Sequence, residues 1–292
     1  LASPALYAAD AAKSSFEWDL RVRHESVDDA GFTRNAEATT ARLRAGLRLV
    51  PGPGWTVLLE GEGVAGAGNY NSSANGKTQY PVVMDPTGAE LNQAWVGWKN
   101  AQGGITVGRQ RIALDNQRWV GNVGWRQNEQ TFDAIGAQWK PVAGLTLNYF
   151  WLDKVHRAAG DHALNTLARA RDLDTHLLNL AFKRGNQQWV GYGYLHEDKD
   201  VASASTATWG LRWTGALDKS GQGFGWAAEL ARQTDYAQNP AHFSHNYWLV
   251  EPSWTQGNNT LRAGWEHLGG DGVTALQTPL ATLHAFNGWD DQ

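Results

Sequence analysis

Arginine recurs at every second position in two stretches near the start of the chain. Arg21 and Arg23 form the first set, and Arg42, Arg44 and Arg48 form the second. Residues two apart on a β-strand share a face, so each set would place its guanidinium groups on one side of a strand. A guanidinium fork binds a carboxylate through two parallel hydrogen bonds. The two sets therefore predict a row of weak, equivalent sites for an anion.

Acidic residues accompany these arginines at positions of the same parity. They are Glu17, Asp19, Glu60 and Glu62. We expect their carboxylates to hold the guanidinium groups in place and to offset their charge, which keeps anion binding weak. For any one charged residue the alternative is a solvated wall without a selective role, and it is the clustering that favours a binding surface.

A second group of charged residues lies between positions 107 and 133. Its members are Arg109, Arg111, Arg118, Arg126 and Asp133. Arg109 and Arg111 have the parity of the apolar Ile105 and Val107, so the alternation fails there and predicts a bulge or an early strand end. The residues that follow carry more hydrogen-bond donors than a simple connector needs. We expect this segment to fold inward as a constriction.

Alternating apolar and polar residues recur along the whole chain and predict about thirteen strands. The predicted strands are Ser14–Glu25, Thr40–Val50, Trp55–Ala65, Leu91–Asn100, Gly104–Leu114, Thr131–Pro141, Leu145–Val155, Asp174–Lys183, Gln188–Glu197, Thr206–Thr214, Gly223–Gln233, Asn246–Trp254 and Thr260–Leu268. Short turns rich in Gly, Pro or Asn alternate with long polar loops. This asymmetry is typical of a transmembrane, antiparallel, up-and-down β-barrel, an all-β fold.

Parity along each predicted strand separates a lipid-facing from a lumen-facing set. Phe16, Trp18 and Leu20 would face lipid, and so would Trp209 and Leu211. Two further arginines, Arg212 and Arg262, would face the lumen on later strands.

Composition agrees with a barrel and excludes several other classes of protein. The 292 residues contain no run that approaches the roughly 20 apolar residues of a membrane-spanning helix. The 16 tryptophans against one methionine suit a water–lipid boundary, where an indole ring is apolar and its N–H stays wet. The net charge of −4 argues against a nucleic-acid binder, and the absence of cysteine suits an oxidising envelope compartment.

The chain divides into a flexible N-terminal segment, residues 1–13, and a single β-barrel domain, residues 14–292. Single-chain bacterial barrels have an even number of strands. We therefore expect a barrel that is incomplete at its C-terminus, with residues 269–292 as an extracellular loop that leads into further strands.

The region from Gly108 to Asp133 resembles the hallmark of alginate-export-type outer-membrane porins. The similar runs are Gly108-Arg109-Gln110, Asp115-Asn116-Gln117-Arg118-Trp119-Val120-Gly121, Trp125-Arg126-Gln127-Asn128 and Thr131-Phe132-Asp133, with His284-Ala285-Phe286-Asn287-Gly288-Trp289 near the end. The resemblance implies a monomeric barrel of roughly sixteen to eighteen strands in the outer membrane of a Gram-negative bacterium. It also implies contact with outer-membrane lipid and an arginine-rich lumen that passes anionic sugar polymers or smaller uronates, without a cofactor.

Two other functions stay open at this point, an outer-membrane β-barrel hydrolase and a soluble all-β carbohydrate-binding protein. The chain lacks a Gly-x-Ser-x-Gly elbow and a His-Glu-x-x-His zinc helix, so we predict no enzyme activity and no metal centre. Two loop clusters could bind a metal weakly: Asp235 with His242 and His245, and Asp161 with Asp172 and Asp174.

Overall fold

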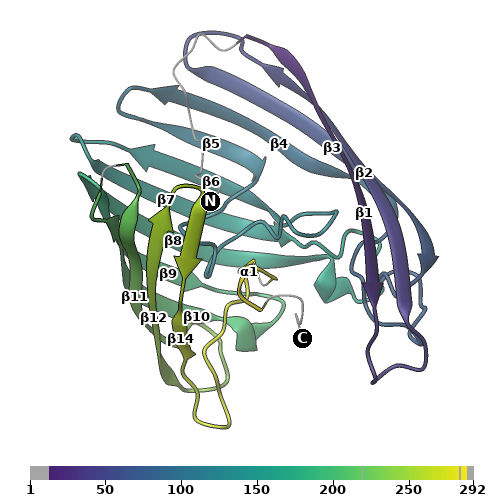
Figure 1. Ribbon diagram of the computed structural model, residues 1–292. Coiled ribbons are helices and arrows are strands. Elements are labelled where there is room, and N and C mark those ends of the chain that lie inside the picture. Colours follow the sequence, from purple (N-terminus) through teal and green to yellow (C-terminus); the bar gives the residue numbers. More distant parts are fainter. Residues whose placement is uncertain (1–12, 219, 283, 288–292) are drawn as a thin grey trace.

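The computed structural model describes residues 13–218, 220–282 and 284–287, and this part of the chain forms one 14-stranded antiparallel sheet. The strands are β1 (Ser15–Val27), β2 (Ala36–Leu49), β3 (Trp55–Asn69), β4 (Gly88–Asn100), β5 (Gly103–Gln110), β6 (Thr131–Trp139), β7 (Leu145–His156), β8 (Ala170–Arg184), β9 (Gln187–His196), β10 (Thr206–Ala216), β11 (Gly223–Asp235), β12 (Ser244–Gln256), β13 (Asn259–Arg262) and β14 (Trp265–Leu268). Two 3₁₀ turns, η1 (Thr166–Ala168) and η2 (Ala202–Ala204), lie in loops, and a short helix, α1 (His284–Asn287), follows the last strand. Neighbours in the sequence are neighbours in the sheet from β1 to β13, and the sheet curves around a central space (Figure 1).

The predicted up-and-down strands are confirmed for β1 to β12, with ends that differ by a few residues. The last predicted strand is instead broken into β13 and β14, and both pieces pair with β12. Pro252 of β12 lies opposite the break, and its carbonyl accepts a hydrogen bond from the amide of Ala263 at 3.2 Å. Because proline has no N–H to donate, the regular ladder cannot continue through this position.

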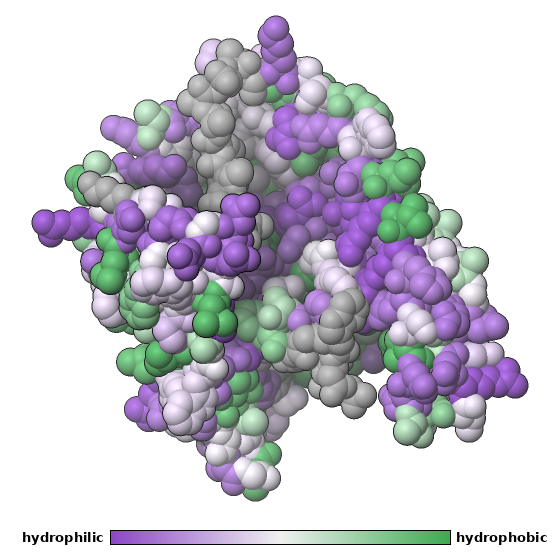
Figure 2. Space-filling model, viewed as in Figure 1, coloured by the Kyte–Doolittle hydropathy of each residue, from purple (hydrophilic) through white to green (hydrophobic). Residues whose placement is uncertain are grey.

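The distribution of side chains on the sheet is the reverse of that in a soluble protein. Trp18 and Leu211 on the outward face are 67% and 54% exposed, whereas Arg42 and Glu62 on the inward face are 5% and 4% exposed. In water, such an apolar surface would favour association with other surfaces. With hydrocarbon outside and a polar interior, the same alternation is stable, so the fold is that of a transmembrane β-barrel. Figure 2 shows hydrophilic side chains gathered in the central hollow, and apolar side chains among those on the outer flanks.

Short and long connections alternate as predicted. Residues 50–54, 101–102, 140–144, 185–186 and 257–258 form short turns at one end of the strands, and residues 217–218 and 220–222 belong to a slightly longer connection at the same end. Gly54 shows why such turns need glycine: its φ is +77°, and an added Cβ would stand 2.3 Å from the carbonyl oxygen of Lys99. In the described part of the chain, no helix is long and apolar enough to cross a membrane.

An apolar cluster fills the inner side of the sheet between β6 and β12. Phe132, Leu152 and Leu177 contribute from the strands, and Trp119 and Val120 contribute from the connection between β5 and β6. The residues after β14 add Leu276 and Leu280 to this cluster.

Residues 269–282 therefore turn back into the barrel, a course that the sequence did not predict for the expected extracellular loop. The carbonyl of Leu280 accepts hydrogen bonds from the amide of Gly121 at 2.9 Å and from Nε2 of Gln130 at 3.0 Å. The burial of Leu276 and Leu280 explains this course. The expected flexible segment, residues 1–13, lies outside the described residues except for Lys13.

Candidate functional site: a charged wall and the segment folded against it

The structure brings the charged residues predicted on β1, β2 and β3 together on the inner face, which we call the charged wall. Its members are Glu17, Asp19, Arg21, Arg23, Arg42, Arg44, Arg48, Glu60 and Glu62. Arg48 Nε donates to Glu17 Oε1 at 2.5 Å, and Arg44 Nε donates to Glu62 Oε2 at 2.5 Å. Arg42 forms an ion pair with Asp19. Arg44 and Glu62 are direct cross-strand partners, whereas Arg48 with Glu17 and Arg42 with Asp19 are diagonal neighbours on the same face, two residues from direct register.

Residues 111–130, which we call the inward segment, cross the barrel from β5 and β6 and lie against the charged wall. Wall arginines hold the segment by its backbone. Arg21 Nη2 donates to the carbonyl of Trp125 at 2.7 Å, and Arg23 Nη1 donates to the same oxygen at 2.8 Å. The carbonyl of Gln127 accepts from Arg42 at 3.3 Å and from Arg44 at 3.2 Å. These arginines therefore bind the backbone of the inward segment as well as facing the lumen.

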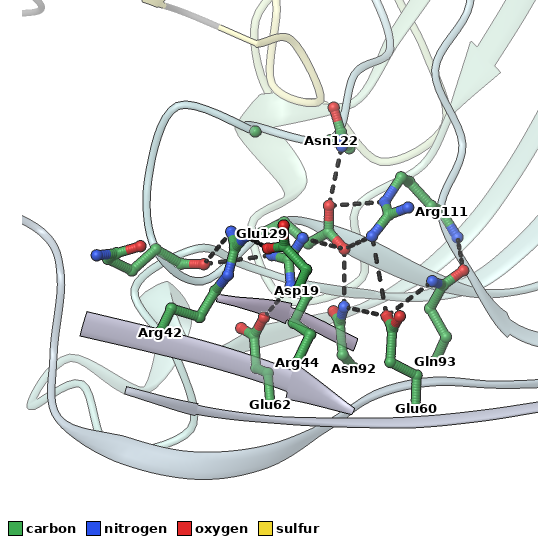
Figure 3. A network of polar contacts seen from close by, with 12 residues as sticks. Asp19, Arg42, Arg44, Glu60, Glu62, Asn92, Gln93, Arg111, Asn122 and Glu129 are labelled. Atoms are coloured by element: carbon green, nitrogen blue, oxygen red, sulfur yellow. Dashed lines mark hydrogen bonds and ion pairs between the residues drawn. The ribbon is translucent and has the colours of Figure 1, made fainter. Parts of the chain in front are cut away.

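Glu129 of the inward segment is the centre of a polar network (Figure 3). It accepts hydrogen bonds from Arg111 Nε at 2.7 Å, Asn122 Nδ2 at 2.9 Å and Asn92 Nδ2 at 2.8 Å. Its carboxylate also lies 3.3 Å from Arg44 Nη1. Burial would raise the pKa of Glu129, but the hydrogen bonds from Arg111 and Asn92 and the charge of Arg44 hold that pKa below its usual value.

A bulge in β4 supplies two amides to this network. The register shifts between Glu60 and Gly61, so the consecutive residues Asn92 and Gln93 are both buried on the inner side. Asn92 Nδ2 and Gln93 Nε2 donate to Glu60 Oε1 at 2.8 and 2.9 Å. The bulge thus fixes Glu60 beside Glu129 and Arg111.

The loop between β3 and β4 provides a further attachment for the inward segment. Asp85 Oδ1 accepts from the amide of Gln127 at 2.8 Å, and Gln127 Nε2 donates to Thr40 Oγ1 at 2.8 Å. Arg126 lies 3.4 Å from Glu25 of β1. In the structure this segment folds into the barrel, as predicted.

The other end of the inward segment is attached to the opposite side of the sheet. Trp119 Nε1 donates to Glu229 Oε1 at 2.8 Å, and Arg212 Nη1 donates to Glu229 Oε2 at 2.5 Å. Arg118 Nη2 forms an ion pair with Glu266 at 2.6 Å. The segment therefore spans the lumen between two sets of charged anchors.

Asp115 lies in the same half of the inward segment and accepts a hydrogen bond from Asn179 Nδ2 at 2.8 Å. Burial, reinforced by the nearby negative charge of Glu229, raises the pKa of Asp115 to about 6. Its carboxyl group therefore gains a proton in the pH range where the usual aspartate is ionised.

Three of the predicted site residues lie apart from the charged wall and the inward segment. Arg109 and Asp133, at the ends of β5 and β6, pair at 2.9 Å and share the parity of the exposed Ile105 and Ile135. His156 Nε2 lies 2.9 Å from Asp133. Arg262 of β13 pairs with Glu251 at 3.2 Å and is half-exposed.

A recess of about 480 Å³ lies between the charged wall and the inward segment. Its lining is Glu17, Trp18, Asp19, Arg21, Arg42, Arg44, Glu60, Arg111, Asn122, Gly124 and Glu129. Eight of these eleven residues are charged, with four arginines against four carboxylates. Because these charges balance, the recess carries little net charge. Its side chains can therefore exchange ion-pair partners with a charged solute.

The two loop clusters considered for metal binding do not form. His242 lies 3.1 Å from Asp235, but His245 bonds Thr274 instead. Asp172 pairs with Lys154, and Asp174 accepts from Trp151. Among the described residues, no group of three His, Asp or Glu side chains could hold a metal ion.

Sequence reasoning missed several residues of these networks. Glu25 and Glu229 could have been found by parity, because Glu25 continues the inward series of β1 and Glu229 lies between the buried Ala227 and Ala231. Asp85 and Glu129 lie in irregular segments, where no periodicity indicates which way a side chain points.

A family model for alginate export matches residues 13–255. The chain belongs to the alginate export family. None of the curated proteins matches it. Family and fold together assign it to the outer membrane of Gram-negative bacteria.

Solved structures of outer-membrane proteins share the fold. OpdO of Pseudomonas aeruginosa has a TM-score of 0.63 at 14% identity, covering 87% of this chain and 64% of its own. OccK8 (OprE) of the same organism has a TM-score of 0.65 at 11% identity, covering 86% and 67%. OpdK of Pseudomonas aeruginosa, solved with vanillate, has a TM-score of 0.61 at 15% identity, covering 88% and 65%. The chain thus spans about two thirds of the length of these structures.

Proposed function

We propose that the protein is an outer-membrane channel for the passive diffusion or export of anionic solutes, above all acidic sugars or oligosaccharides such as uronates. The observation that supports it best is the recess, where four arginines line the space beside the inward segment. Family membership supports a path for an acidic polysaccharide. The protein would act as a monomer surrounded by outer-membrane lipid, with neither enzyme activity nor a cofactor.

Exchange of ion pairs is the mechanism that we propose for passage. The Arg42 side chain is only 7% exposed, whereas that of its partner Asp19 is 59% exposed. The cation is therefore held by its surroundings, and the carboxylate is the partner that can move. A solute carboxylate can take the place of Asp19 on Arg42, and the return of Asp19 then releases the solute.

Glu17 and Arg48 provide a second exchangeable pair further along the wall. Their side chains are 40% and 32% exposed, and they are joined by two hydrogen bonds. The wall thus offers an acidic solute several guanidinium groups, each with a resident competitor. Competition keeps the residence time short, which diffusion through a channel requires.

The test uses the full-length protein in planar bilayers, with current block by a uronic oligosaccharide as the readout. Arg42→Glu should lower the anion preference and weaken the block. Asp19→Asn should strengthen the block, because it removes the competitor. Arg262→Glu, the same charge reversal at a residue paired with Glu251 away from the recess, serves as the control.

Opposite effects at the two members of one ion pair separate solute binding from a purely structural role. A structural role predicts that both substitutions disturb the channel in the same direction. An unchanged anion preference in Arg42→Glu, or a weaker block in Asp19→Asn, would contradict the proposal.

A further inference from the structure

Trp95 is a tryptophan on the inner face of the barrel, and the proposed passage of anionic solutes does not by itself require it. It shares the inward parity of Gln93 and Gly97 on β4, and its Nε1 lies 3.4 Å from Gln93 Oε1. The outward tryptophan of the same strand, Trp98, is 37% exposed toward the lipid side. Trp95 is half-buried. An aromatic face toward a polar lumen needs an explanation other than lipid contact.

Glycines leave the surroundings of this ring open. Gly97 is the next inward residue along β4, and an added Cβ there would stand 3.4 Å from Cζ3 of Trp95, so the indole lies against that glycine. Gly108 of β5 is the cross-strand neighbour of Trp95. The ring therefore lies along the inner face of β4, with glycine as its neighbour along the strand and across to β5.

Arg48 lies over the same ring at a long distance. On the inner face, Leu58 of β3 separates Arg48 of β2 from Trp95 of β4, and it is only 3% exposed beneath them. The guanidinium carbon of Arg48 is 5.7 Å from the centroid of the Trp95 ring, compared with 4.2 Å for Arg23 over Trp125. The longer distance is near the limit for a cation–π contact, so the guanidinium group does not cover the ring face closely.

The indole of Trp95 beside the Arg48–Glu17 pair fits one unit of an acidic sugar. A pyranose ring has an apolar face of C–H groups that can pack flat on an indole. Its carboxylate can bind the Arg48 fork in place of Glu17, and its hydroxyl groups can donate to Glu17. An anion without an apolar face would use the arginine alone.

We propose that Trp95, with Arg48 and Glu17, forms a subsite for a single uronate unit on the short-turn side of the inward segment. Arg48 is four residues beyond Arg44 on β2, so the subsite lies about 13 Å along the strand from the contact with Gln127. In outer-membrane barrels the short turns face the periplasm, so a solute arriving from that side would meet the subsite before the constriction. The subsite rests on the proposed function and adds to it the chemistry by which a sugar is preferred over a simple anion.

The test compares Trp95→Leu, Trp95→Phe and the control Trp98→Leu in the full-length protein. Current block is measured with a uronic oligosaccharide, with its neutral counterpart and with acetate, each added from the short-turn side. Trp95→Leu should raise the dissociation constant for both oligosaccharides roughly two- to tenfold, the range expected for the loss of an aromatic face. Trp95→Phe and Trp98→Leu should stay near the parent value, and acetate should not distinguish the variants.

The outcomes separate this inference from the proposed function. If the parent protein shows no block by the uronic oligosaccharide, the proposed function fails and the subsite fails with it. If the parent is blocked but Trp95→Leu binds as tightly as Trp95→Phe, the function stands and the subsite is wrong. An equal loss in Trp95→Phe and Trp95→Leu, or a loss for acetate as well, would also overturn the subsite.

Discussion

Arg44 joins the charged wall to the inward segment, and its removal should loosen that segment. Its three guanidinium nitrogens contact Glu62, the carbonyl of Gln127 and Glu129, and its side chain is only 10% exposed. Arg44→Ala leaves the buried Glu129 of the segment without this ion pair and removes the hydrogen bond to the carbonyl of Gln127. Breaking a buried ion pair costs about 3 kcal/mol, at the lower end of the usual range because the lumen is polar. That corresponds to a shift on the order of 100-fold in the equilibrium between attached and detached segment.

Hydrogen–deuterium exchange of residues 122–130 measures this equilibrium, because amide exchange reports local opening. The amide of Gln127, which donates to Asp85 at 2.8 Å, should exchange faster in Arg44→Ala by a similar factor. Arg48→Ala is the matched control, since Arg48 has the same parity on β2 but pairs with Glu17. If exchange in residues 122–130 is equal in the two variants, the wall arginines do not hold the segment and the reasoning is refuted.

Two further predictions concern pH and the lipid face. The pKa of Asp115 is raised to about 6 by burial, so the folded state favours its protonated form. The stability that this group contributes is fully present below about pH 4 and is lost as the pH rises through about 6. Exchange of residues 112–121, corrected for the intrinsic rate, should therefore increase between pH 5 and pH 7.5, and Asp115→Asn should abolish the increase. Leu211→Arg places a charge on the outward face at the middle of β10 and should lower the free energy of unfolding in lipid vesicles by about 2–4 kcal/mol. Leu211→Met should have little effect, and an equal loss in both variants would contradict the assignment of that face to lipid.

The sheet was predictable because its alternation is physical and local. A side chain such as Leu211 must meet hydrocarbon, and Arg212 must meet water, so parity alone assigns both to their faces. The inward segment was predictable in outline, from its many donors and the early end of β5. The partners of those donors were not predictable.

Many of the partners that could not be predicted are backbone carbonyl oxygens. Arg21 donates to the carbonyls of Gly124, Trp125 and Arg126, and every residue carries such an oxygen. The sequence therefore gives no sign of which residues an arginine will clamp. The interruption at Ala263 and Gly264 was missed for another reason: Pro252, which lies opposite, belongs to a different predicted strand, and the register between the two is a tertiary property.

Cysteine accessibility along β2 tests the central claim, that one face of the sheet meets lipid and the other meets water. These 292 residues contain no cysteine, so each variant adds a single thiol to them. In the full-length protein in bilayers, a charged, membrane-impermeant thiol reagent should modify cysteines at positions 42, 44 and 48 and change the conductance at each. Cysteines at positions 43, 45 and 47 should stay unmodified. Equal reaction on both sets, or reaction on the second set alone, would contradict the account.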